Sequence, residues 1–302
     1  MRYVYLVLGI IAITVITLVT FCDDEIYYYY AKFGIKDEVI ENEYHYEDNF
    51  IYVDEYKEEE IHNKEELYNT VYYLVNSGTR YAKRYFNIDY IDYEKDYSEL
   101  FSDENKLNII NNFVHPYNSF DYIEASLKGY TLEINIKYDD MYNEEKQEEI
   151  NTKVNSIIDE LIESNMNDKE KIKVIHDYIV NNTTYDKDFC VTEEDCITTS
   201  IYNSDTAYGV LFQNNGICSG YTDLMAIFLT KLGIVNYRMT NETHTWNAVK
   251  LDDKWYILDV TWDDPISDKD VLSHTYFLIT AKEDSLLKES HTYNKNIFVE
   301  LN

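Results

Sequence analysis

The chain has 302 residues, of which 45% are hydrophobic, so it can bury a sizeable core and holds one or two globular domains. Its 57 acidic and 26 basic residues give a formal net charge of -31 at pH 7. A surface this negative repels phosphate backbones, which argues against nucleic-acid binding. We interpret the charge as a solvated surface that keeps the protein soluble.

The first 22 residues predict a membrane anchor. The run from Tyr3 to Cys22 is apolar and uncharged, and it is about long enough to cross a bilayer. Arg2 precedes it and acidic residues follow it, so the positive-inside rule places the N-terminus in the cytoplasm and the rest outside the cell. Phe21 is unlike the small residue that cleavage or lipidation favours, although a cleaved, secreted form and a lipidated form stay alternatives.

Residues 23–140 form an acidic, tyrosine-rich region for which the sequence indicates no chemistry. A helix is expected near residues 65–75. The stretch "YTLEINIKY" predicts a strand, because Leu132, Ile134 and Ile136 alternate with polar residues. We therefore expect an N-terminal α/β domain of unassigned function over residues 23–140, followed by a second domain over residues 141–302.

Two amphipathic helices are predicted at the start of the second domain. The first carries apolar residues at helical spacing: Ile150, Val154, Ile157, Ile158, Leu161 and Ile162. The second begins with the capping-box pattern of Asn167 and Glu170. His176 lies beside its apolar face, and we interpret it as a hydrogen-bonded structural histidine because nothing near it completes a catalytic set.

The sequence "CVTEEDC" places Cys190 and Cys196 close together. Outside the cell, two such cysteines can close a small loop disulfide, which is the pairing we predict. Two free thiols or a metal pair are the alternatives. A metal pair is the weakest of them, because no further cysteine or histidine lies nearby to complete a ligand set.

The stretch "NNGICSGYTDLMAIFLTKLG" predicts a helix that begins at Cys218 and stops at Gly233. The N–H groups and the macrodipole at a helix N-terminus favour negative charge, which makes the nucleophilic thiolate available near neutral pH. We expect Gly216 to turn the chain sharply into the helix and Gly220 to let another backbone or a substrate pass closely. Cys218 is thus a candidate nucleophile, although free cysteine is also a common buried hydrophobic residue.

The segment "THTWNAVKLDDKWYILDVTW" predicts a β-hairpin whose turn residues are Asp252 and Asp253. In that register His244 and Asp259 are diagonal neighbours on one face, close enough for the carboxylate to hold the imidazole. A three-residue turn would place the two side chains on opposite faces. Trp246 and Trp262 lie on the same hairpin, where they either wall the site against water or simply pack.

These residues carry a resemblance to a known family. The stretches "GICSGYTDLMAIFLTKLGI" and "HTWNAVKLDDKWYILDVTWDDP" resemble the transglutaminase-like superfamily, which is related to papain, over about residues 168–265. The resemblance implies an α+β core in which the cysteine-bearing helix packs on an antiparallel sheet. It also implies that Cys218 is the nucleophile, that His244 is the general base and then the acid, and that Asp259 orients His244.

The active members share acyl transfer through a thioester, so the resemblance implies the same chemistry on amide bonds. An oxyanion donor is then needed, and the N–H of Cys218 is the first candidate. The papain-like glutamine suggests Gln213 as the second donor, and Tyr208 is the alternative. No calcium loop of the EF-hand type occurs in the sequence, so we expect no metal and no cofactor.

The sequence thus predicts a membrane-anchored cysteine protease or amidase that faces outward and acts on peptides, surface proteins or cell-wall peptides. Hydrolysis is the expected outcome, because water competes with any amine unless the site binds that amine. Two alternatives stay open. One is a transglutaminase that cross-links proteins, and the other is a surface binding module that keeps the fold without turnover.

Overall fold

The computed structural model describes residues 28, 29, 32, 33, 38–189, 200–266 and 271–302. The predicted anchor over residues 1–22 and the predicted disulfide between Cys190 and Cys196 lie outside these ranges. Within them, no helix has both the length and the apolar character that a membrane crossing requires.

A four-stranded sheet forms the centre of the N-terminal half, in the order β1-β2-β4-β3. Its strands are β1 (Glu60–Ile61), β2 (Tyr81–Phe86), β3 (Phe120–Lys128) and β4 (Thr131–Tyr138). Only the β1–β2 pair is parallel among these four strands. In β4 the predicted alternation is confirmed, because Leu132, Ile134 and Ile136 are all buried.

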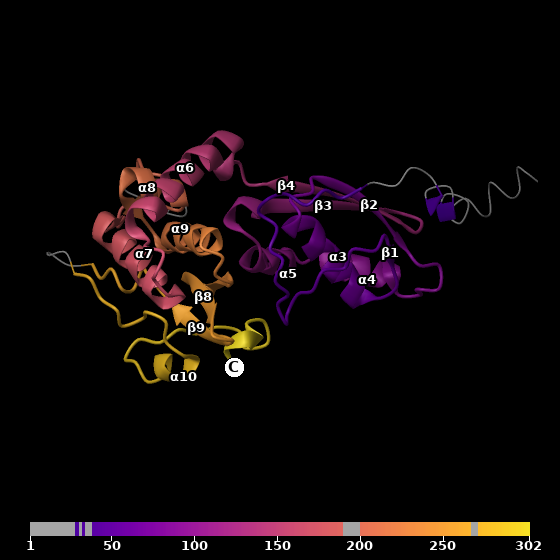
Figure 1. The fold of residues 1–302 in the computed structure, drawn as a ribbon. Helices are drawn as coiled ribbons and strands as arrows, with labels where there is room; N and C mark the ends of the chain where they lie inside the picture. Colours follow the sequence, from indigo (N-terminus) through magenta and orange to yellow (C-terminus); the bar gives the residue numbers. More distant parts are fainter. Residues whose placement is uncertain (1–27, 30–31, 34–37, 190–199, 267–270) are drawn as a thin grey trace, which may run out of the picture.

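Helices lie along one side of this sheet (Figure 1). They are α3 (Lys64–Asn76), α4 (Tyr93–Phe101) and α5 (Glu104–Asn108), and the short helices η1 (Ile109–Phe113) and η2 (Pro116–Asn118) follow them. The helix expected over residues 65–75 is confirmed as α3. The domain boundary predicted at residue 140 lies in η3 (Asp140–Tyr142), between β4 and the next long helix.

The C-terminal half is built from helices around a three-stranded antiparallel sheet. The helices are α6 (Glu144–Leu161), α7 (Asp168–Asn182), α8 (Ala207–Gln213) and α9 (Cys218–Lys231). The sheet consists of β7 (Asn236–Thr240), β8 (Thr245–Leu251) and β9 (Lys254–Leu258). The predicted capping box of Asn167 and Glu170 is present at the start of α7.

Shorter elements complete this half. The strands β5 (Thr184–Tyr185) and β6 (Asn215–Gly216) pair in parallel, and β6 ends just before α9 begins. The chain then ends through α10 (Ala281–Asp284) and η5 (Val299–Leu301).

The predicted hairpin register is confirmed. Asp252 and Asp253 have φ values of 48° and 59°, the left-handed angles of a two-residue type I′ turn. The pairs Lys250 with Trp255 and Asn247 with Leu258 follow from that turn. As a result, His244 and Asp259 lie next to each other at the open end of the hairpin.

The sheet β7-β8-β9 lies between two hydrophobic cores. One face contributes Tyr237 and Trp246 to a core that Phe113 of the N-terminal half also joins. The other face contributes Val249 and Leu258 to the core that α7, α8 and α9 form. The N-terminal half therefore supports the sheet that carries His244 and Asp259.

Candidate active site

Cys218 is the first residue of α9, as predicted, and it is half-buried and free of disulfide bonds. The preceding Ile217 has no side chain that caps the helix. The first-turn N–H groups are thus not used by an N-cap side chain, and they favour a negative charge at this point. A hydrogen bond of 2.8 Å from the N–H of Ile217 to the carbonyl oxygen of Ser204 fixes where the chain enters the helix.

The two glycines beside Cys218 have different roles. A Cβ on Gly220 would overlap the carbonyl oxygens of Ser204 and Thr206, so the predicted close approach of another backbone is confirmed. The prediction for Gly216 is wrong, because the left-handed residue of this turn is Asn214, with φ of 58°. Gly216 is required by packing, since a Cβ there would overlap the ring of Tyr221.

His244 and Asp259 are hydrogen bonded, with 2.6 Å between Nε2 and Oδ2. Asp259 is fully buried, and its Oδ1 accepts a hydrogen bond of 3.0 Å from the N–H of Trp262. A carboxylate only accepts, so Nε2 of His244 carries a hydrogen and Nδ1 is the nitrogen left for Cys218. This is the tautomer that a general base opposite a thiol requires.

The charges in the site favour an imidazolium. Burial alone would lower the pKa of His244, but its hydrogen bonds to Asp259 and to Cys218 outweigh burial and raise that pKa to about 9. Burial would raise the pKa of Asp259, but hydrogen bonds from His244 and His291 hold it below its ordinary value. An anionic Asp259 and a protonated His244 next to the thiol can therefore coexist at neutral pH.

Both tryptophans predicted to wall the site stack on His244. The ring centroid of Trp262 lies 4.8 Å from that of His244 at an interplanar angle of 8°, and that of Trp246 lies 5.6 Å away at 21°. Trp246 is fully buried and Trp262 is half-buried. The two indoles limit how far the imidazole can rotate and shield its bond to Asp259 from water.

Gln213 and Tyr208, the candidates for a second oxyanion donor, are engaged elsewhere. The side-chain oxygen of Gln213 accepts a hydrogen bond of 2.8 Å from the N–H of Asn203. The ring of Tyr208 packs on Phe212 at 4.7 Å and lies 5.6 Å from the ammonium of Lys146 on α6. Neither set of contacts includes Cys218, so the structure gives these two predictions no support.

His291 is a residue of this site that the sequence did not indicate. Its Nε2 lies 3.0 Å from Oδ2 of Asp259, the same oxygen that His244 contacts. The ring is fully buried and stacks on Trp262 at 4.3 Å between ring centroids. His291 comes from the segment after α10, outside the stretches that resemble the superfamily, and no spacing relates it to Asp259.

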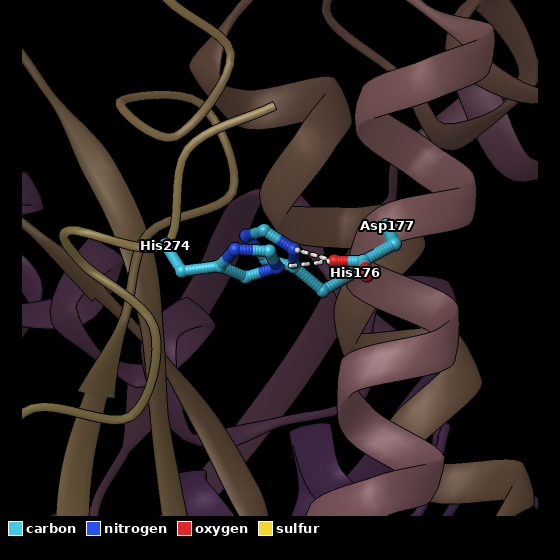
Figure 2. A group of neighbouring side chains, drawn as sticks. All are labelled: His176, Asp177 and His274. Carbon is cyan, nitrogen blue, oxygen red and sulfur yellow. Dashed lines mark hydrogen bonds and ion pairs between the residues drawn. The ribbon is translucent and has the colours of Figure 1, made fainter. Parts of the chain in front are cut away.

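A second histidine cluster lies on α7 (Figure 2). His176 and Asp177 are on the helix, and His274 reaches across from the C-terminal loop so that both rings meet Oδ1 of Asp177, at 3.0 and 2.6 Å. The other nitrogen of His176 lies 3.2 Å from a carboxylate oxygen of the buried Asp263. The prediction that His176 is a hydrogen-bonded buried histidine is confirmed.

Three groups of histidines and carboxylates have donor atoms that lie within 4.8 Å of one another, among the residues that the structure describes. They are His176 with Asp177 and His274, His244 with Asp259 and His291, and His45 with Glu41 and Glu55. In the first and third, a lysine already supplies a cation: Lys173 lies 2.6 Å from Asp177, and Lys57 lies 2.7 Å from Glu41. In the second, the imidazoles themselves carry the hydrogens that the carboxylate accepts. Hydrogen bonds and ion pairs thus account for each group without a metal.

Comparison with known proteins finds a family to which part of the chain is similar. Residues 155–260 match the family model of the transglutaminase-like superfamily. Among solved structures, the chain is similar to a TGase, with 16% identity over 47% of this chain and a TM-score of 0.35. It is also similar to a candidate cysteine protease from Cytophaga hutchinsonii, with 12% identity over 46% of this chain and a TM-score of 0.29. The chain spans 44% and 61% of those two proteins, and no curated protein matches it.

Proposed function

We propose that the chain is a cysteine-dependent acyl-transfer enzyme that acts on amide bonds in peptides or proteins, because residues 155–260 match the family model of the transglutaminase-like superfamily. The observation that carries the proposal is the spatial arrangement of Cys218, His244 and Asp259. The thiol opens a helix and lies close enough to the imidazole of His244 to raise its pKa, and a buried carboxylate holds that imidazole at 2.6 Å. This is the arrangement of an activated nucleophile, its base and the group that orients the base.

The first step forms a thioester. The thiolate of Cys218 attacks the amide carbonyl carbon, and the carbonyl π electrons move to oxygen and give a tetrahedral oxyanion. The proposed donor to that oxyanion is the N–H of Cys218, which lies at the start of α9. When the C–N bond breaks, the protonated imidazole of His244 gives its proton to the leaving nitrogen, and a neutral amine departs.

The second step regenerates the thiol. A water molecule attacks the thioester carbonyl, and His244, now neutral, takes its proton as a base. The C–S bond then breaks, which releases a carboxylic acid and restores the paired Cys218 and His244. We propose water as the acceptor because, among the described residues, the contacts around Cys218 and His244 indicate no amine site, and water competes wherever the site does not exclude it.

We also propose a substrate class and a location, both from the sequence. A site for amide bonds takes a peptide or protein substrate, and the apolar run with Arg2 before it supports an anchored domain that works outside the cell. Surface proteins and cell-wall peptides are therefore the substrates that we propose. The net charge of -31 disfavours nucleic acid as a partner.

The test is a product analysis with the full-length chain. Glutamine-containing and asparagine-containing peptides are incubated with wild type or with Cys218→Ala, with and without an added primary amine, and the products are identified by mass spectrometry. We expect hydrolysis that requires Cys218 and a Cys218 thioester in acid-quenched samples. If the peptide is joined to the added amine and no hydrolysis product forms, the enzyme is a cross-linking transglutaminase and not a hydrolase. If Cys218 forms no adduct, even with a peptidyl vinyl sulfone, the proposal of an enzyme is contradicted and a surface binding module is the function that fits.

A further inference from the structure

Both ring nitrogens of His291 are occupied by buried carboxylates. Nε2 lies 3.0 Å from Oδ2 of Asp259, and Nδ1 lies 2.6 Å from Oδ1 of Asp284. The backbone N–H of His291 also donates to Oδ2 of Asp284, at 2.9 Å. Asp284 is the last residue of α10, so this helix and the loop after it are tied to the carboxylate that holds His244.

A count of protons shows what this arrangement requires. An ionised carboxylate has no hydrogen to donate, so a short contact to each ring nitrogen needs a hydrogen on each of them. One proton is then shared between Nδ1 of His291 and Asp284, and the hydrogen bonds on both sides of the ring offset the cost of burying these polar groups. If the shared proton lies instead on Asp284, His291 still donates its Nε2–H to Asp259.

Asp259 is held by three donors. His244 and His291 share Oδ2, and the N–H of Trp262 occupies Oδ1. The rings of His291 and Trp246 are 4.4 Å apart between centroids, and both tryptophans also stack on His244. His291 therefore fixes where the carboxylate points and forms the back of the aromatic shell around the imidazole.

We propose that His291, anchored by Asp284, is a positioning residue of this site: it fixes the orientation of Asp259 and takes up part of the negative charge that His244 would otherwise feel. The inference rests on the proposed function, because it assigns His291 a part in the same reaction. His291 lies beyond residues 155–260, so a C-terminal segment outside the family match completes the site.

The sign of the effect follows from the charges near Asp259. Those that face it are His244 and His291, with Asp284 behind His291 and Asp263 one turn further along. The phenol of Tyr276 interacts electrostatically with Asp259, Asp263 and Asp284, and that of Tyr293 with Asp284. Loss of the hydrogen bond from His291 leaves Asp259 more negative towards His244, which stabilises the imidazolium. The pH at which His244 loses its proton, about 9 in the wild type, should then rise.

The experiment follows alkylation of Cys218 by iodoacetamide from about pH 5 to pH 10, with peptide mapping to isolate this cysteine. The full-length wild type is compared with His244→Ala, His291→Ala and Asp284→Asn. Asp284→Asn is nearly isosteric. The amide of the new asparagine donates to Nδ1 of His291, so the imidazole of His291 keeps its hydrogen on Nε2 and still donates to Asp259. His176→Gln is the matched control, since His176 is also buried between two carboxylates.

We expect the alkaline inflection to move up by about half a pH unit or more in His291→Ala and in Asp284→Asn. Alkylation at neutral pH should slow by about 10-fold in His291→Ala, because Asp259 loses its fixed orientation, and by less in Asp284→Asn. His176→Gln should leave the inflection where it is. Folded Asp284→Asn and His291→Ala proteins with the wild-type inflection would overturn the inference. A wild-type profile identical to that of His244→Ala would instead overturn the proposed function, and this inference with it.

Discussion

His176 and His291 are two buried histidines in nearly the same chemical setting. Each has a carboxylate on both ring nitrogens: Asp177 and Asp263 for His176, Asp259 and Asp284 for His291. They differ in what lies beyond those carboxylates. Asp177 leads to the exposed side chains of Lys173 and His274, whereas Asp259 leads to the imidazole that faces Cys218.

The difference shows that burial and hydrogen bonding of a histidine do not decide its role. His176 joins α7 to the segment of Asp263, whose other oxygen accepts the N–H of Tyr276 at 3.0 Å, so its contacts hold two parts of the fold together. His291 makes the same kind of contacts, but one of its partners is Asp259, the carboxylate that holds the proposed catalytic base His244. The following predictions change one cluster at a time, and they begin with the largest effect.

Asp259→Asn should cost the most activity. The amide favours the wrong tautomer of His244, and a comparable change in serine proteases lowers kcat by about 10⁴-fold. Without the carboxylate, the pKa of His244 should fall from about 9 towards its ordinary value of 6.5. The pH dependence of Cys218 alkylation measures this shift, which is opposite in direction to the shift expected for His291→Ala. An inflection that stays near pH 9 would show that Asp259 does not set the charge of His244.

His176→Ala should reduce stability without altering the site. It leaves Asp263 buried with an unpaired charge, and removal of one partner from a buried pair typically costs about 3 to 5 kcal/mol of unfolding free energy. Urea unfolding followed by circular dichroism measures the loss. Alkylation of Cys218 in the folded protein should keep the wild-type pH profile, and a displaced profile would mean that the two clusters are coupled through the turn from Asp259 to Asp263.

The wild type should lose stability on the alkaline side because of the active-site cluster. The folded-state pKa of His244 is raised from 6.5 to about 9, so its contribution is complete below pH 6.5 and disappears as the pH rises through about 9. The full contribution is on the order of 3 kcal/mol. Urea midpoints at pH 6 and pH 10 should therefore differ less in His244→Ala than in the wild type, and equal differences would contradict the assigned charge of His244.

Lys173→Ala should have the smallest effect. The lysine side chain is 49% exposed, and its ion pair with Asp177 is one that solvent screens. The expected change in unfolding free energy is below about 1 kcal/mol, with no change in Cys218 alkylation. A loss as large as that of His176→Ala would show that the exposed end of the α7 cluster carries its stability.

Local patterns in the sequence were sufficient for much of the site. The turn at Asp252 and Asp253 fixes the hairpin register, and the register brings His244 to Asp259. The start of α9 at Cys218 follows equally from apolar spacing and the flanking glycines. Each of these features depends on residues close together in the chain, where turn chemistry and helix periodicity determine the structure.

The features that escaped prediction depend on how distant segments pack. His291 reaches Asp259 only because the chain returns to the hairpin after α10, and no periodicity encodes that path. The sequence predicts a turn at Gly216, because the packing of this glycine against Tyr221 cannot be seen in the sequence. In the same way, Phe113 of the N-terminal half shares a core with Trp246, although the sequence reads as two separate regions.

The rate of Cys218 alkylation by iodoacetamide, compared between the full-length wild type and His244→Ala across pH, tests the paired thiol and imidazole most directly. If His244 holds a thiolate at Cys218, labelling should remain fast well below pH 8 in the wild type and slow there in the variant. An ordinary thiol profile that is identical in both proteins would mean that Cys218 and His244 do not act as a pair. It would also contradict the assignment of this site to acyl transfer.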